Sequence, residues 1–121
     1  MTPQQVYTML TSIDDDIPVA YYRFLDTAEQ PAPAPPFLCY YYPSGADFYA
    51  DNSNYQIVSD LIVELYTDFK DFTLEERVES VLNANELTWE KEETYIDDQR
   101  MHMTIWTTEV VQTSNGGTLN G

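Results

Sequence analysis

The chain has 121 residues, of which 43% are hydrophobic and 14% aromatic. This length and composition predict one domain with a genuine hydrophobic core and exclude a disordered acidic tail. The 21 acidic residues outnumber the 5 basic ones, so the formal net charge is −16. That charge argues against binding nucleic acid, because phosphate contacts need clustered Lys and Arg. It fits a channel wall that repels DNA, a basic protein partner, or a mimic of nucleic acid.

The sequence gives no sign of an oxidising compartment or of a membrane. The single cysteine, Cys39, forms no disulfide within the chain, and we expect it to pack as a small apolar residue. Residues 1–10 lack the cationic and apolar regions of a signal peptide. No window approaches the ~20 apolar residues that a membrane helix needs. These features predict a soluble protein made in the cytoplasm.

The first third of the chain predicts a helix and two strands. Thr2 and Pro3 form a favourable N-cap and first-turn pair, and apolar residues then recur at helical spacing as far as Ile13. Residues 19–24 (VAYYRF) and 37–42 (FLCYYY) are β-branched or aromatic, which is typical of strands.

The middle of the chain predicts a loop and then a long strand. Residues 26–36 are rich in proline, so we expect an extended loop that joins no sheet. Residues 43–45 predict a turn, and residues 46–52 a short strand or a structured loop. Side chains alternate from residue 54 to 67, which predicts one strand face against the helices and a mixed face toward solvent or another subunit. The face toward the helices comprises Ile57, Ser59, Leu61, Val63 and Leu65.

The last third predicts a second helix and a hairpin. Residues 73–76 (TLEE) match a capping box at the start of a helix. Two strands follow at residues 88–96 and 101–112, joined by an acidic turn as an antiparallel hairpin. Residues 113–121 are rich in Gly, Asn, Ser and Thr, and they predict a flexible tail.

This order of elements predicts an α+β fold with an antiparallel sheet of four to five strands and two helices packed on one face. Residues 1–112 would form this single domain, with residues 113–121 as its tail. The opposite face of the sheet would stay partly uncovered. Its Tyr, Trp and Ile residues would need a partner.

The residue types that carry catalysis or bind metals form no convincing group. His102 is the only histidine, and its sequence neighbours Met101 and Met103 suggest an ordinary strand position. Acidic pairs are frequent, but among 21 acids they arise without selection for acid–base chemistry. The pair Gly116 and Gly117 precedes no helix, so it makes no phosphate-binding loop. We therefore expect no enzyme activity, no cofactor and no metal.

Tyrosines are dense in the first two predicted strands. Tyr21 and Tyr22 are consecutive, and so are Tyr40, Tyr41 and Tyr42, so both faces of each strand carry rings. The core explains one face. The other face is either ordinary surface or a set of amphipathic rings of the kind enriched at the centres of protein interfaces.

Several segments together resemble a known family. The strand PVAYYRF at residues 18–24, the strand PPFLCY at 35–40 and the segment FYADN at 48–52 come in this order. The strand LIVELYTD at 61–68 and a short Glu-rich helix follow. Over residues 18–111 the chain resembles small proteins of long-tailed phages and prophages of Gram-positive bacteria, and these look like tail terminator, or tail completion, proteins.

The resemblance implies a structural virion protein. It would form a ring, usually a homo-hexamer, at the head-proximal end of the tail. The ring would stop polymerisation of the major tail tube protein and join the tail to the head-closure or connector protein. The genome DNA would pass through without specific binding, because acidic walls gain nothing from phosphate contact. Assembly would take place in the cytoplasm of the host bacterium, without a membrane.

Two sets of residues would carry these contacts. The ring-bearing residues predicted at a subunit or neck interface are Tyr40, Tyr42, Phe48, Tyr49, Tyr66 and Trp106. The acids predicted to face the channel or neighbouring rings are Asp47, Asp51, Asp97 and Asp98, on segments that project from the sheet. The tail at residues 113–121 would become ordered only on docking to the head or the tube.

Two other functions fit the same composition. Head-closure and adaptor proteins of the phage neck have a similar size. An acidic mimic of DNA that inhibits a host enzyme would also be strongly negative, but it would display carboxylates in phosphate-like rows. The acids of this chain are instead spread over helices, turns and strands, which disfavours the mimic.

Overall fold

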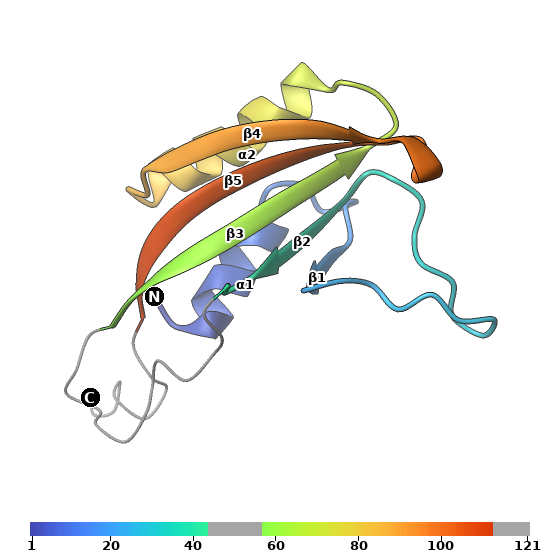
Figure 1. Ribbon diagram of the computed structural model, residues 1–121. Coiled ribbons are helices and arrows are strands. Elements are labelled where there is room, and N and C mark those ends of the chain that lie inside the picture. Colours follow the sequence, from blue (N-terminus) through green and yellow to red (C-terminus); the bar gives the residue numbers. More distant parts are fainter. Residues whose placement is uncertain (44–56, 113–121) are drawn as a thin grey trace.

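Two helices and a five-stranded sheet make up the computed structural model, which describes residues 1–43 and 57–112 (Figure 1). The elements in chain order are α1 (Pro3–Thr11), β1 (Val19–Tyr21), β2 (Phe37–Tyr41), β3 (Ile57–Thr67), α2 (Phe72–Ala84), β4 (Trp89–Ile96), the 3₁₀ turn η1 (Asp97–Gln99) and β5 (Met101–Gln112). Both helices lie behind the sheet in Figure 1, on the same side of it. The predicted α+β fold is confirmed.

Helix α1 begins where its capping residues predict. The Thr2 hydroxyl accepts a hydrogen bond from the backbone N–H of Gln5 at 3.1 Å, and the Gln5 side chain accepts one from the N–H of Thr2 at 2.8 Å. This reciprocal pair satisfies two amides that a helix start leaves without partners. The helix buries Val6, Met9 and Leu10.

Helix α2 begins before its predicted capping box. Asp71 is the N-cap, and its carboxylate accepts a hydrogen bond from the backbone N–H of Leu74 at 3.0 Å. Thr73 therefore lies inside the helix, and the prediction that residues 73–76 form the capping box is wrong. An aspartate caps at least as well as a threonine, and its charge also interacts favourably with the positive end of the helix dipole.

The strands are ordered β1-β2-β3-β5-β4, and every neighbouring pair is antiparallel except β1 and β2. β1 runs parallel to β2, with Val19 opposite Leu38, so the predicted fully antiparallel sheet is wrong at this edge. Tyr22 has a φ of 71°, which ends β1 sooner than predicted. Parallel neighbours need a crossover connection, and the proline-rich residues 22–36 supply it. We call residues 22–36 the crossover.

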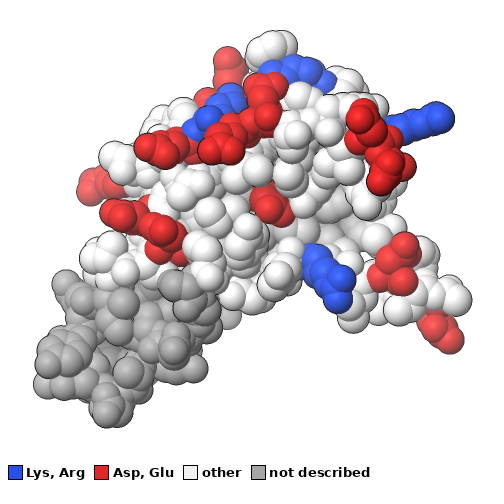
Figure 2. Space-filling model, viewed as in Figure 1, with Lys and Arg blue, Asp and Glu red and all other residues white. Residues whose placement is uncertain are grey.

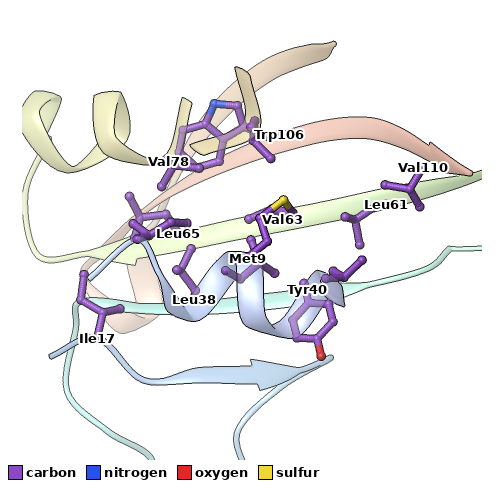
Figure 3. Packing of buried hydrophobic residues seen from close by; sticks show 14 of the residues in the cluster. Met9, Ile17, Leu38, Tyr40, Leu61, Val63, Leu65, Val78, Trp106 and Val110 are labelled. Atoms are coloured by element: carbon purple, nitrogen blue, oxygen red, sulfur yellow. The ribbon is translucent and has the colours of Figure 1, made fainter. Parts of the chain in front are cut away.

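The core lies between the two helices and one face of the sheet (Figure 3). Leu61, Val63 and Leu65 of β3 are 0% exposed, as their alternation predicts. Trp106 of β5 and Val78 of α2 are also 0% exposed. The helices therefore cover one face of the sheet, and the other face is turned away from them.

Candidate interaction surface

The face of the sheet turned away from both helices is the largest candidate for a functional surface. We call it the uncovered face. It comprises Phe37, Cys39 and Tyr41 of β2, Val58, Asp60, Ile62, Glu64 and Tyr66 of β3, Glu90, Glu92 and Thr94 of β4, and Met103, Ile105, Thr107, Glu109 and Val111 of β5. Figure 2 views this face: its middle is mostly uncharged, and acids gather along β4.

Aromatic rings pack against one another across the uncovered face. Phe37 stacks on Tyr66 with ring centroids 4.8 Å apart, and Phe24 meets Phe37 edge-on at 5.4 Å. Tyr22 stacks on Tyr41 at 5.4 Å, although Tyr22 is still 64% exposed. Such pairs are worth about 0.5–1.5 kcal/mol beyond the area that they bury. The rings fix the crossover against the sheet and leave amphipathic surface toward solvent.

Burial changes the protonation behaviour of three groups on this face. Burial raises the pKa of Glu64 above its usual range, even though the Tyr66 hydroxyl donates it a hydrogen bond of 2.8 Å. Burial and the Glu64 carboxylate raise the pKa of Tyr66 as well. Burial, with Glu64 nearby, raises the pKa of Cys39 to about 11, so this thiol stays protonated at neutral pH. Since the thiolate is the reactive form, Cys39 is a poor nucleophile.

A groove of about 500 Å³ runs between the crossover and the sheet. We call it the arginine groove. Its walls include Tyr22, Arg23, Phe24, Phe37, Tyr66 and Met101. Arg100 lies next to Met101 in the turn after η1, where it is exposed and has a φ of 53°. The wall of the groove is thus largely apolar and aromatic, and it carries one cationic and one anionic side chain, Arg23 and Asp26.

A second hollow, of about 520 Å³, lies at the opposite end of the sheet. We call it the acidic hollow. Its walls include Asp60, Glu90, Glu109, Thr88, Trp89 and Thr107. Asp60 and Glu109 are direct cross-strand partners, and like charges in that arrangement destabilise a sheet. No described cationic side chain forms an ion pair with either of them.

A cluster of charged side chains lies between α2 and β4. The Glu75 side chain is 2% exposed, and one of its oxygens lies 2.9 Å from both Lys70 and Lys91. Its other oxygen accepts a hydrogen bond from Thr104 at 3.2 Å. Burial alone would raise the pKa of Glu75, but the bonds from the two lysines outweigh it and lower that pKa. Both oxygens of this buried carboxylate therefore have partners within the chain.

The remaining residues of this cluster extend the same network. Lys91 also contacts Glu79 at 2.8 Å, and Lys70 contacts Glu93 at 2.8 Å. His102 lies 3.2 Å from Glu93. Within residues 1–43 and 57–112, no group of three or more His, Cys, Asp or Glu side chains is arranged to hold a metal ion.

Three of the six ring-bearing residues predicted at an interface lie in the core. Tyr40 is 7% exposed, Tyr42 is 5% exposed and Trp106 is 0% exposed. The Trp106 indole N–H donates to Glu79 at 3.1 Å, beneath α2. These three residues alternate onto the helix side of the sheet and are already covered within one molecule. Burial leaves these three residues almost no surface for the predicted contact with another subunit.

The other predicted residues either lie outside the core or are not described by the structure. Tyr66 lies on the uncovered face, half-buried in its stack with Phe37. Asp97 and Asp98 are exposed in η1, at the tip of the β4–β5 hairpin. The remaining predicted positions, Phe48, Tyr49, Asp47 and Asp51, lie outside the described residues.

The structure also brings forward residues that the sequence reasoning did not assign to a site. Tyr22 and Tyr41 form a stacked pair that is at least partly exposed, buried Phe37 supports the neighbouring stack with Tyr66, and Arg23 lines the groove beside them. For Tyr41 the signal was present, because it alternates with Tyr40 and Tyr42. The sequence did not indicate which of these tyrosines faces the helices, because rings occupy both sides of the strand.

Comparison with known proteins identifies no relative: no protein-family model, curated protein or solved structure matches the chain. None of the helices in the described part of the chain is long and apolar enough to cross a membrane.

Proposed function

We propose that the protein is a structural subunit of a phage virion, a tail terminator that forms a ring at the head-proximal end of the tail tube. The observation that carries the proposal is the uncovered face, an aromatic and aliphatic surface bordered by acids. Apolar surface of this kind commonly marks a site of protein contact. The resemblance of residues 18–111 to tail terminator proteins suggests the partners, which are further copies of the chain and neighbouring neck proteins.

The edges of the sheet favour contact through its face and ends over the addition of strands. β1 offers only 3 residues at one edge. β4, at the other edge, carries the charged run Glu90, Lys91, Glu92 and Glu93. Short edges and charged edges both resist pairing with a further strand. A ring of these subunits would therefore be held together by side-chain contacts.

The charge of the chain suits a ring through which DNA passes. A formal charge of −16 on each copy gives a wall that phosphates do not adhere to, because contact releases no counterions. Asp97 and Asp98 at the exposed hairpin tip are the described acids that we assign to such a wall. The ring would let the genome slide toward the tail tube.

The proposal is tested first by the size of the particle. Native mass spectrometry and negative-stain electron microscopy of the purified chain should reveal rings, with a hexamer expected. Addition of the protein to growing tubes of the major tail tube protein should stop their elongation. Tubes that lengthen normally in its presence would count against the terminator role.

The same measurements separate the alternatives. A head-closure or adaptor protein would form rings that bind the head connector and leave tube growth unchanged. A mimic of DNA would stay a monomer or a dimer and would inhibit a DNA-binding enzyme in competition with DNA.

A further inference from the structure

The few cationic side chains of the chain differ in whether they form ion pairs with described acids. Of the 5 basic residues, Lys70, Lys91 and Arg77 form ion pairs with described acids. Arg23 and Arg100 form none within residues 1–43 and 57–112. Both are exposed; Arg23 lines the arginine groove together with Asp26, and Arg100 directly precedes the groove residue Met101 in the sequence. In a chain with 21 acids, two exposed arginines that pair with no described acid, one in the wall of the groove and one beside that wall in the sequence, call for an anionic partner.

The opposite end of the uncovered face has the complementary character. Asp60 and Glu109 face each other there across β3 and β5, with Glu90 beside them in the acidic hollow. Val58 and Val111 are paired at the same end and are 61% and 42% exposed. This end therefore offers carboxylates that pair with no described cation, together with exposed aliphatic surface.

The two ends cannot meet within one molecule. Tyr66 in the arginine groove and Asp60 in the acidic hollow lie on the same strand, six residues apart in number. A strand rises about 3.3 Å per residue, so these positions are about 20 Å apart. That distance exceeds the reach of an arginine side chain. Contact between the two ends requires a second copy of the chain.

We infer that copies of this chain join head to tail, with the acidic end of one copy seated against the arginine groove of the next. Arg23 and Arg100 pair with Asp60 and Glu109 of the neighbour, and the neighbour's valines cover the groove's rings. The contact relieves the repulsion between Asp60 and Glu109, and it buries apolar surface on both sides. The occupant of the groove is thus a second copy.

A head-to-tail contact leaves one groove and one acidic end free on every pair. Such contacts propagate until a rotation closes them into a ring, and without closure they give a filament. The inference deepens the proposed function and rests on it for the closure into a ring. It supplies the contact that the buried residues Tyr40, Tyr42 and Trp106 cannot make.

Charge reversal tests the contact directly. The variant R23E/R100E reverses the charge of the two arginines, and the variant D60K/E109K reverses the charge of the two acids at the acidic end. Each variant alone should associate at least about tenfold more weakly than the wild type, because like charges then meet. An equimolar mixture of the two variants should recover association, since every contact in an alternating assembly is again complementary. Native mass spectrometry and sedimentation velocity measure both effects.

Recovery in the mixture also shows that both variants fold. The matched control for D60K/E109K is D15K/E76K, which also replaces two acids by two lysines, but at two exposed positions away from the uncovered face. It should associate at least as well as the wild type, since it lowers the net repulsion. A wild-type oligomer that both reversals leave intact would overturn this contact while leaving the proposed function standing. A chain that stays monomeric at every concentration, alone or with the tube protein, would overturn both.

Discussion

Phe37 on β2 and Tyr66 on β3 are cross-strand partners whose rings stack at 4.8 Å with an angle of 20° between their planes. The stack has two further partners: Phe24 of the crossover lies edge-on against Phe37, and the Tyr66 hydroxyl donates a hydrogen bond to Glu64. These contacts hold the proline-rich crossover and the wall of the groove against the middle of the sheet.

The stack should show as a measurable coupling energy. In a double-mutant cycle with Phe37→Leu and Tyr66→Leu, followed by urea unfolding, we expect a coupling of about 1 kcal/mol. The control pairs Phe37→Leu with Phe72→Leu, since Phe72 is 68% exposed on α2. That pair should be additive. Additivity for Phe37 and Tyr66 as well would mean that the ring contact contributes no stability.

Glu75 should be the most sensitive charged residue of the fold. Glu75→Gln removes the charge between Lys70 and Lys91, and we expect it to lower the free energy of unfolding by about 3 kcal/mol. Glu76→Gln, on the exposed side of the same helix, should change it by less than about 0.5 kcal/mol. Equal effects of the two substitutions in urea unfolding would contradict a structural role for the network.

The difference between wild type and Glu75→Gln should also depend on pH. The folded-state pKa of Glu75 lies below its unfolded value of about 4.5, so its stabilising effect is present above that value. As the pH falls through the lowered pKa, the carboxylate is protonated and the effect is lost. Unfolding curves between pH 7 and pH 3 should therefore converge for the two proteins.

Glu64 should behave in the opposite way. Its pKa is raised by burial, so the charged form is less stable in the folded protein than in the unfolded chain. Glu64→Gln should therefore be more stable than wild type at pH 7, and the gain should vanish below its unfolded pKa of about 4.5. Thermal unfolding at pH 7 and pH 4 measures the change. A less stable variant at pH 7 would show that the hydrogen bond from Tyr66 outweighs the cost of burying the charge.

Cys39 offers a reporter of the arginine groove. Its thiol is buried beside the crossover, and its pKa is raised from 9.0 to about 11. Because only the thiolate reacts, labelling at pH 8 should be about a hundredfold slower in the folded protein than in urea. Phe24→Ala should speed labelling by loosening the crossover, whereas Phe69→Ala, at an exposed position, should not. Fast labelling of the folded wild type would show that the crossover opens readily.

The sequence predicted those parts of the fold that local patterns determine. The capping pair at Thr2, the alternation along β3 and the acidic turn between β4 and β5 each depend on residues close together in the chain. Their outcomes are a helix that starts at Pro3, a strand that buries Leu61, Val63 and Leu65, and an antiparallel hairpin.

The pairing of β1 with β2 could not be predicted in the same way. Both strands are short and aromatic, and a connection of this length permits either direction. The side on which Tyr40 lies was undetermined for a similar reason, since Tyr41 offers an equally apolar alternative. Burial against α1 decides between them, and that contact joins parts of the chain that no local pattern links.

The charges of the candidate surface were the least predictable part. The sequence shows 21 acids and 5 bases but not their pairing. Only the fold shows that Lys70 and Lys91 both pair with Glu75 of α2, whereas Arg23 and Arg100 pair with no acid in the described part of the chain. The candidate contact therefore depends on Arg23 of the crossover and Arg100 of the β4–β5 turn as well as on the acids.

The arginine groove has a consequence for how the protein is made. Its walls come from residues 22–39 and from Tyr66, Gln99 and Met101, which the ribosome adds later. A nascent chain that has not yet placed β3 beside β2 carries no groove at all. Copies emerging side by side from one messenger would thus remain separate until each had finished folding, and docking would be confined to complete subunits.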